Sequence, residues 1–251
     1  MKKPIIIKNK ISKFSKSIKV SGDKSISIRW ALLASQAIGK SKAYNILKSE
    51  DVLSTLKCLK KLGIKIKLKN EICEIDGNGL NSYNYKKNLV LNAGNSGTLG
   101  RLILGLLINS PKKIKLIGDK SLSKRDFKRI AEPLSKFGAS FKLNNKCNLP
   151  LIITGSQKLK PIKFYEKKGS AQCKSSVILG GIKVQGKTII KARKSRNHTE
   201  LLFKHLNLPI KVKKNKNFDI INVNKVNNIK PINYEIPSDI SSAAFFIALT
   251  I

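Results

Sequence analysis

The sequence is poor in the residues that usually mark metal sites, secretion and membrane insertion. Its 251 residues include four cysteines and two histidines, with no CxxC pattern and no Cys/His ligand spacing. This gives no sign of a zinc site and predicts reduced thiols. No apolar run approaches the roughly 18 residues of a membrane span, and the opening segment MKKPIIIKNK lacks the roughly seven apolar residues of a signal peptide. We therefore expect a cytoplasmic protein with no membrane partner and no metal.

Acidic residues, aromatic residues and arginine are also scarce. Only 14 Asp and Glu accompany 51 Lys and Arg, for a formal charge of +37, yet only six of the basic residues are Arg and 6% of all residues are aromatic. Nucleic-acid readout and stacking favour Arg and aromatic side chains. We therefore interpret the lysines as a mainly solvated surface that attracts anionic metabolites, and expect no nucleic-acid partner. A lysine-rich nucleic-acid-binding module stays an alternative. Because Arg is rare here, we expect it where a planar, bidentate group is needed, as on phosphate or carboxylate.

The sequence does contain an internal repeat. A Gly/Ser-rich opening followed by an apolar helix begins at Gly22, Gly94, Gly169 and Ser238. Between these openings come a strand (42–47, 112–118 and 187–192), an amphipathic helix and two short strands. Each amphipathic helix is expected to begin at a Ser suited to an N-cap, in the segments SEDVL, SKRDF and SRNHT. The repeat predicts three βαβαββ units of about 70 residues each.

The fold class predicted from this repeat is α/β (α+β), with the apolar helices inside and the amphipathic helices and sheets outside. Three buried helix N-termini then meet at one end of the globule, where their free N–H groups and partial positive charge form an anion site that includes Lys24. We expect residues 15–235 to form this three-unit globule. Residues 1–14 and 236–251 are expected to begin a second globule, because the fourth repeat stops after its first helix.

Six ordered segments carry a resemblance to a known family. SGDKSISIRW, LNAGNSGTLGRL, GDKSLSKRDFKRIAEPLSKFGA, KGSAQCKSSVILGGI, SRNHTE and IPSDISSAAFF resemble the successive signatures of the 5-enolpyruvylshikimate-3-phosphate (EPSP) synthase family. The resemblance implies an inverse α/β barrel-like fold of repeated βαβαββ units. It also implies transfer of the enolpyruvyl group of phosphoenolpyruvate to the 5-hydroxyl of shikimate 3-phosphate, with release of phosphate, on the way to chorismate. No metal or organic cofactor is implied, and the full-length form is expected to be a monomer.

The resemblance also assigns roles to individual residues. It places shikimate 3-phosphate on Lys24, Ser25, Arg29, Ser170, Ala171, Gln172, Ser195 and Arg196. It places phosphoenolpyruvate on Lys24, Asn95, Gly97, Arg125 and Gln172. Lys24, held between two anionic ligands, is the candidate catalytic residue, because it can stabilise developing charge or relay a proton. We interpret His198 as an ordinary half-buried histidine and Arg129 as a surface residue, and we leave open whether Arg101 pairs a carboxylate or touches substrate.

The chain also departs from the family pattern. The family usually has His, Pro and Gly where this chain has Ile28, Asp126 and Ser238, and Asp126 could compete for the guanidinium of Arg125. Family members carry six units, so the family's general-base Asp has no counterpart here. We therefore expect the 251-residue chain to be inactive alone but to retain weak affinity for shikimate 3-phosphate. The sister enolpyruvyl transferase acting on UDP-N-acetylglucosamine is an alternative, although its opening motif is typically GxKN rather than GDKS.

Overall fold

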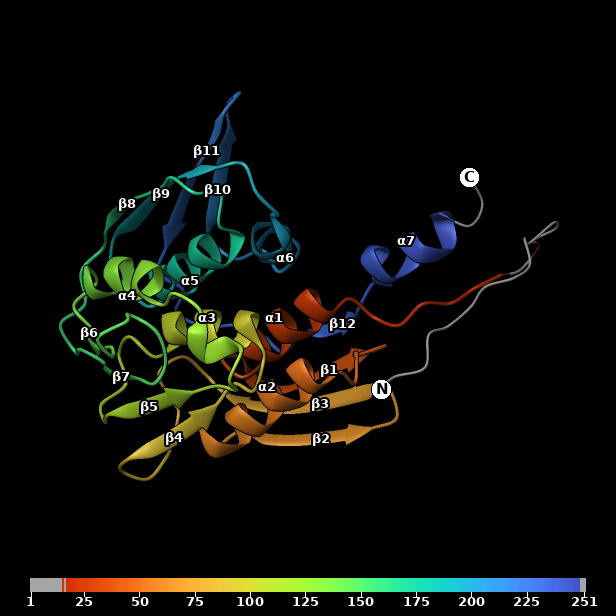
Figure 1. The fold of residues 1–251 in the computed structure, drawn as a ribbon, viewed down its shortest axis with the longest axis horizontal. Coiled ribbons are helices and arrows are strands. Elements are labelled where there is room, and N and C mark those ends of the chain that lie inside the picture. The colour runs from red at the N-terminus through yellow and green to blue at the C-terminus, as the bar shows by residue number, and fades with distance from the viewer. Residues whose placement is uncertain (1–14, 16, 249–251) are drawn as a thin grey trace, which may run out of the picture.

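The computed structural model describes residue 15 and residues 17–248. Residues 1–14, which we expected in a second globule, lie outside the described residues, as do 16 and 249–251. In the described part, three sheets surround a layer of buried helices (Figure 1). Among these residues, no helix is both long and apolar enough to cross a membrane.

The three units follow one another along the chain. The first contains α1 (Lys24–Ala34), β1 (Ile38–Tyr44), α2 (Glu50–Lys61), β2 (Lys65–Lys69) and β3 (Ile72–Asn78). The second contains β4 (Leu89–Asn92), α3 (Gly97–Leu106), β5 (Ile114–Ile117), a 3-10 turn η1 (Leu122–Lys124), α4 (Lys128–Ser135), β6 (Ser140–Lys142) and β7 (Leu151–Thr154). The third contains β8 (Lys163–Glu166), α5 (Ala171–Gly181), β9 (Lys187–Arg193), α6 (His198–His205), β10 (Ile210–Lys214) and β11 (Phe218–Asn224). β12 (Asn233–Glu235) and α7 (Ile240–Ala248) come last.

Sheet topology confirms the predicted repeat. The sheets have the orders β12-β1-β3-β2, β4-β5-β7-β6 and β8-β9-β11-β10, which are the same arrangement three times. In each sheet the first two strands are parallel and the remaining pairs are antiparallel. The first sheet differs in one respect, because its first strand comes from the other end of the described chain: β12 pairs with β1 through Lys42 opposite Asn233 and Tyr44 opposite Glu235.

The first helix of each unit lies inside, as its apolar sequence predicts. Every residue of α3 is buried, and most of α1 and α5 are buried too. Gly105 of α3 lies against the α5 backbone, where an added Cβ would meet the Ser176 carbonyl oxygen. Glycine therefore allows the two central helices to pack backbone to backbone. The apolar run from Ile26 to Ile38 contains a shorter helix than its length suggests, since α1 ends at Ala34.

The second helix of each unit is amphipathic; its start was predicted correctly for α2 and incorrectly for α4 and α6. Ser49 does occupy the N-cap of α2, yet its side chain makes no capping hydrogen bond. Ser123 lies within η1 and donates to the Gly118 carbonyl oxygen, and α4 begins only at Lys128. In the third unit the N-cap is Asn197, two residues after the expected Ser195. A hydroxyl can bond to nearby backbone without starting a helix, so a Ser in a polar segment is a weak boundary signal.

The chain leaves the three-sheet body near Ser238. At this point the chain passes antiparallel to the segment that leads into α1. Gly22 forms a β-bridge with Ser238, and the Asp23 N–H donates to the Pro237 carbonyl oxygen. No residue of α7 is buried, and Phe245 is 77% exposed. In Figure 1, α7 extends away from the sheets on the same side as residues 17–20.

Candidate anion-binding site

The N-terminus of α1 carries a cation that two carboxylates offset. Asp23 is the N-cap, and its Oδ1 accepts from the Ile26 N–H at 2.7 Å. Lys24 follows as the first helical residue, and its Nζ lies 3.1 Å from Asp51 Oδ2 at the start of α2. The Lys24 side chain is 47% exposed, so this ion pair is weak and can exchange for an incoming anion. Lys24 therefore stands at the positive end of a helix dipole with its ammonium group accessible.

Arg29, one turn into α1, is buried and ties that helix to α5 and α6. Its Nε donates to Thr199 Oγ1 at 2.8 Å, its Nη1 to the Ser25 carbonyl oxygen at 2.9 Å and its Nη2 to Ser175 Oγ at 3.4 Å. Thr199 Oγ1 in turn donates to Ser175 Oγ at 2.7 Å. Burial lowers the pKa of Arg29 to about 10, although the Glu200 carboxylate opposes that shift. The guanidinium still has N–H groups beyond these three bonds.

The start of α6 adds further polar groups beside Arg29. Arg196 is exposed, and its charge acts on Arg29 strongly enough to lower the pKa of that group further. Ser195 Oγ is buried and has no hydrogen-bond partner. Burial, and then the Arg29 charge, lower the pKa of the half-buried His198. This histidine is therefore neutral near pH 7, in line with its interpretation as an ordinary residue.

A buried ion pair fixes α5 to α6 behind these groups. Lys174 Nζ lies 2.6 Å from Glu200 Oε1, and the side chains are 1% and 5% exposed. Removing either partner from such a pair leaves an uncompensated buried charge, at a cost of about 3–5 kcal/mol. Nothing in the sequence marks this pair, because one Lys among many gives no sign of burial.

A second group of cations surrounds the N-terminus of α3. Gly97 is its first residue, after the N-cap Ser96. An added Cβ at Gly97 would lie 2.9 Å from Arg125 Nη1, so only glycine lets the guanidinium approach this closely. Arg125 Nη2 donates to Asn95 Oδ1 at 3.2 Å, and Asn95 Nδ2 donates to Asp119 Oδ2 at 2.7 Å.

The expected competition from Asp126 does not occur. Its Oδ1 instead accepts from the Lys128 N–H at 2.8 Å, at the start of α4. Arg125 is exposed, and its hydrogen bond to Asn95 is to a neutral amide. Its charge is therefore available to an anion at the start of α3.

Gln172 joins the α3 and α5 ends. Its Nε2 donates to Thr98 Oγ1 at 3.1 Å, and its Oε1 accepts from Arg101 Nη1. Arg101 stacks over the Phe127 ring at 5.6 Å, and burial, aided by Arg129 and Arg125, lowers its pKa to about 10. Arg101 is bonded to an amide and none of the ion pairs among the described residues includes it, so it does not pair a carboxylate there.

The start of α5 lies between the two cationic groups. Ser170 is its N-cap, with Oγ accepting from the Cys173 N–H at 3.3 Å, and Ala171 is the first helical residue. Gln172 reaches α3 while Ser175 reaches Arg29 and Thr199. The structure thus brings the predicted residues of α1, α3, α5 and α6 to neighbouring helix starts, although Ser170 and Gln172 already have protein partners.

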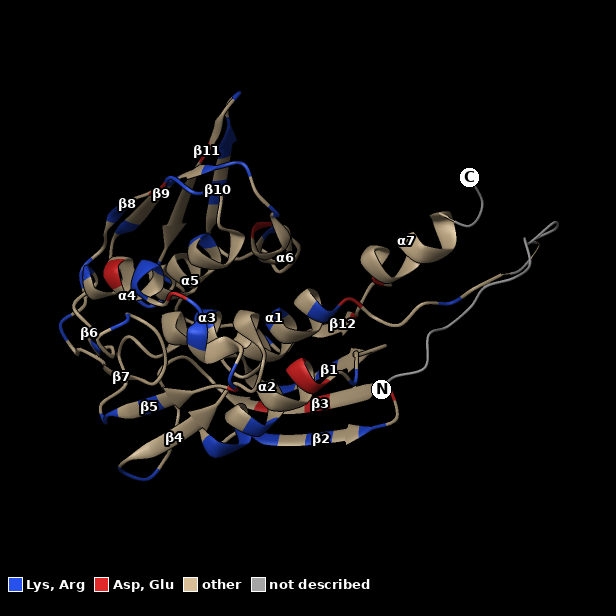
Figure 2. Ribbon diagram, viewed as in Figure 1, with Lys and Arg blue, Asp and Glu red and all other residues tan. Residues whose placement is uncertain are grey.

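Other outcomes at the site differ from expectation. Arg129 is not a surface residue, since it is half-buried and its Nε is buried with no partner. Thr98, Thr199 and Ser175 complete the hydrogen-bond network but were not predicted. Their only signal was a position one to three residues from a predicted residue. Lysines and arginines occur on all three sheets and on the connecting loops (Figure 2). Among the described residues, the buried cations Arg29, Arg101 and Lys174 lie in the first two turns of α1, α3 and α5, whereas the buried Lys183 follows the end of α5.

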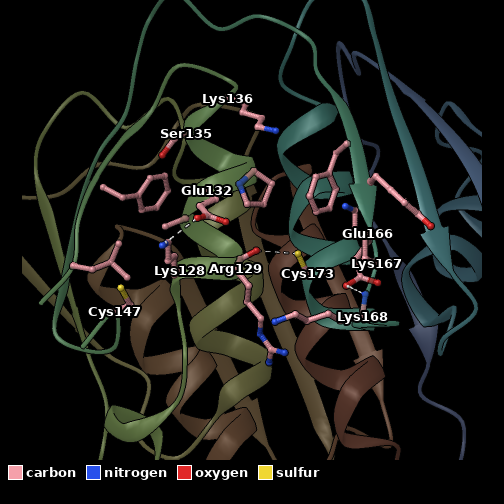
Figure 3. Close-up of a pocket in the computed structure, with 16 residues that line it drawn as sticks. Lys128, Arg129, Glu132, Ser135, Lys136, Cys147, Glu166, Lys167, Lys168 and Cys173 are labelled. Carbon is pink, nitrogen blue, oxygen red and sulfur yellow. Dashed lines mark hydrogen bonds and ion pairs between the residues drawn. The ribbon is translucent and has the colours of Figure 1, made fainter. Parts of the chain in front are cut away.

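A cavity among the described residues lies away from these helix starts. It measures about 690 Å³ and lies over α4, between β6 and β8 (Figure 3). None of the site residues assigned above lines it; a smaller cavity of about 620 Å³ includes Arg125 together with Asp119 and Lys124. At the helix starts, Lys24 and Arg125 are exposed while Arg29 is buried.

Comparison with known proteins gives consistent matches. The model of the family EPSP synthase (3-phosphoshikimate 1-carboxyvinyltransferase) matches residues 8–251. A 3-phosphoshikimate 1-carboxyvinyltransferase of Caldicellulosiruptor saccharolyticus is 41% identical over 244 residues, which are 95% of this chain and 55% of the relative. One of Vesicomyosocius okutanii is 43% identical over 233 residues, covering 92% of this chain and 52% of the relative.

A solved structure agrees with these relatives. The EPSP synthase of Acinetobacter baumannii superposes with a TM-score of 0.83 at 36% identity, covering 92% of this chain and 51% of that chain. The chain thus spans about half the length of the curated relatives it matches. The family match covers nearly the whole chain, and the solved relative shares its fold. The chain belongs to the EPSP synthase family.

Proposed function

We propose that this chain supplies half of an active site that transfers the enolpyruvyl group of phosphoenolpyruvate to the 5-hydroxyl of shikimate 3-phosphate, releasing phosphate. The observation that carries the proposal is the gathering of Lys24, Arg29, Arg125 and Gln172 at neighbouring helix starts. Two phosphorylated substrates need many fixed donors, and helix N-termini with Arg and Lys side chains supply them.

We assign shikimate 3-phosphate to the α1 and α6 side, with Lys24, Ser25, Arg29, Ser195 and Arg196. The buried and unpartnered Ser195 Oγ supports this assignment, because such a hydroxyl gains a partner when an anion binds. Ser170, Ala171 and Gln172 at the start of α5 complete this subsite in the proposal. Arg29 already ties three helices together, so its remaining donors are held in a fixed direction.

Phosphoenolpyruvate is assigned to the α3 side, with Asn95, Gly97 and Arg125. The glycine supports this, since it leaves room for Arg125 beside the free amides of α3. Gln172, held between Thr98 and Arg101, lies on this side and is positioned to contact both ligands. Lys24 completes this subsite as the shared cation.

The hydroxyl loses its proton as its oxygen adds to C2 of phosphoenolpyruvate, and the methylene carbon gains a proton to become a methyl group. Phosphate then leaves the tetrahedral intermediate while that methyl group loses a proton, which restores the C=C bond of the enolpyruvyl group. Lys24 is suited to stabilise the negative charge that develops on the leaving phosphate. The neighbouring carboxylates are already occupied: Asp23 caps α1, Asp51 pairs with Lys24 and Glu200 pairs with Lys174. The described residues therefore supply binding and charge stabilisation, and we propose that the groups that move protons lie outside them.

We also propose that residues 15–235 are the structural unit that carries these residues, and that the complete protein is a cytoplasmic monomer. The repeated sheet order supports the first statement, because β12 ends at Glu235 and closes the first sheet. The four cysteines are free, as expected in a reducing compartment.

Calorimetry on the 251-residue chain tests the proposal. We expect weak binding of shikimate 3-phosphate, lost in Lys24→Ala and kept in the control Lys60→Ala, an exposed lysine on α2. A phosphate-release assay with both substrates is expected to show no turnover by the chain alone. Equal binding by both variants contradicts the assignment of Lys24, and turnover contradicts the view that proton-moving groups lie outside the described residues.

A further inference from the structure

The cavity over α4 has a mixed lining that the proposed reaction does not use. Its walls combine apolar side chains of β6, β8 and the following loop with charged side chains of α4 and β8 (Figure 3). The volume of about 690 Å³ falls within the range of about 300–1,000 Å³ usual for small-molecule sites. We call this cavity the α4 groove.

Two side chains of opposite charge that line the α4 groove, Glu166 and Arg129, each have one buried atom without a hydrogen-bond partner. Glu166 is 5% exposed; its Oε1 accepts from the Lys168 N–H at 3.1 Å, but its Oε2 is buried with no hydrogen-bond partner. Arg129 Nε is likewise buried and unpartnered. In Figure 3 these two side chains lie on either side of Cys173, whose thiol donates to the Arg129 carbonyl oxygen at 3.1 Å. They form no ion pair with each other, so each can accept a separate group of one ligand.

The unpartnered atoms define what such a ligand carries. A buried carboxylate oxygen calls for a hydrogen-bond donor, best a cation, and a buried guanidinium N–H calls for an acceptor, best a carboxylate. Lys167 and Lys168 also line the groove and make its overall charge positive, which favours a ligand that carries a carboxylate. An ammonium group and a carboxylate on one small molecule meet both needs.

The apolar lining defines the rest of the ligand. Phe141 and Phe164 are half-buried, and Leu143 lies with them along the groove, whereas the Tyr165 ring packs against Phe218 of β11. Two aromatic side chains favour a flat ring through offset or edge-to-face packing. On α4 itself, Lys128 is already paired with Glu132 at 3.6 Å, so that side chain is less available to a ligand.

We propose that the α4 groove binds a free α-amino acid with an aromatic side chain. Its ammonium group donates to Glu166 Oε2, its carboxylate accepts from Arg129 Nε and its ring packs against Phe164, which shares a face of β8 with Glu166. The proposal concerns binding only. It is independent of the proposed function, because none of the residues assigned to the two substrates lines the groove.

The proposal is tested by titrating the 251-residue chain with L-phenylalanine, followed by calorimetry and by NMR of the backbone amides. Three probes separate the groups of the ligand: 3-phenylpropanoate lacks the ammonium group, 2-phenylethylamine lacks the carboxylate and L-alanine lacks the ring. We expect L-phenylalanine to bind at least about tenfold more tightly than each of the three, since each loses one charge-assisted bond or the ring contact. Amide shifts are expected at residues 164–168 and 128–133.

Glu166→Gln removes the charge but keeps Oε1 as an acceptor for the Lys168 N–H. We expect about tenfold weaker binding of L-phenylalanine in this variant, and unchanged binding in Glu74→Gln, an exposed carboxylate on β3. A circular dichroism spectrum and thermal unfolding confirm that both variants fold. Binding of 3-phenylpropanoate as tight as L-phenylalanine, unchanged affinity in Glu166→Gln, or no binding of any probe because water fills the groove, would each overturn the proposal.

Discussion

Lys183, a buried lysine just after the end of α5, is expected to make the stability of the protein depend on pH. It follows the C-cap of α5, is 7% exposed, and its Nζ donates to Asn81 Oδ1 at 3.1 Å and Asn109 Oδ1 at 3.2 Å. Tyr83, whose ring lies 5.9 Å from Nζ, bonds in turn to Ser35 at the end of α1. Burial lowers the pKa of Lys183 from 10.5 to about 7.

The lowered pKa of Lys183 determines how the free energy of unfolding depends on pH. Between about pH 7 and pH 10.5 the unfolded chain keeps the proton that the folded protein has lost, so the free energy of unfolding rises with pH. From a folded pKa of about 7, the gain between about pH 6 and pH 9 is about 2.6 kcal/mol. Lys183→Met removes this gain. Loss of the two bonds to the Asn amides lowers its stability by an amount that does not depend on pH.

The measurement is urea unfolding of the wild type and Lys183→Met at several pH values, with the exposed Lys187→Met as control. Between about pH 6 and pH 9, we expect the free energy of unfolding of the wild type to rise by about 2–3 kcal/mol more than that of Lys183→Met. It is expected to rise by the same amount as that of Lys187→Met. Parallel pH profiles for wild type and Lys183→Met would refute the reasoning. They would show that the Asn oxygens and the helix C-termini keep Lys183 protonated throughout.

Three further predictions concern the site. In a protein that also contains the rest of a family member's length, Lys24→Ala is expected to weaken shikimate 3-phosphate binding about tenfold or more through loss of a charge-assisted bond, and unchanged affinity by calorimetry contradicts this. Gly97→Ala places a Cβ 2.9 Å from Arg125 Nη1, so we expect weaker phosphoenolpyruvate binding with unchanged thermal unfolding; a higher KM for that substrate alone is the confirming result. Lys174→Met is expected to cost about 3–5 kcal/mol in urea unfolding, and adding Glu200→Gln is expected to recover part of it. No recovery in the double variant would show that the ion pair itself carries the stability.

The arrangement of the fold was predictable because it depends on periodic burial. The three Gly/Ser-rich openings followed by apolar runs correspond to α1, α3 and α5, the buried layer. The strand predicted at 187–192 matches β9 closely, and Gly63 and Gly138 adopt positive φ just after α2 and α4. The spacing of apolar residues determines which face of a helix or strand is buried, so that face can be predicted from the sequence.

Side-chain partners and helix starts were less predictable. Ser123 and Ser195 resemble N-caps in sequence, yet neither caps a helix, since a hydroxyl has several backbone partners within reach. Arg129 looked like one more surface cation, and only the packing of α4 against α5 shows that its Nε is buried. The family resemblance assigned Arg125 and Gly97 to the same substrate, but only the structure shows that the two residues are in contact.

The strand that closes the first sheet has a consequence for how the chain folds during synthesis. β1 pairs with β12 through Lys42 and Asn233, which are 191 residues apart in sequence. At about 5–20 residues per second, the ribosome makes β12 roughly 10–40 s after β1. During that interval the β1 edge that β12 will cover has no strand beside it, and such an edge can pair with another chain. Newly made chains are therefore most exposed to misassembly before residue 235 leaves the ribosome, and a chaperone that covers this edge would act within that interval.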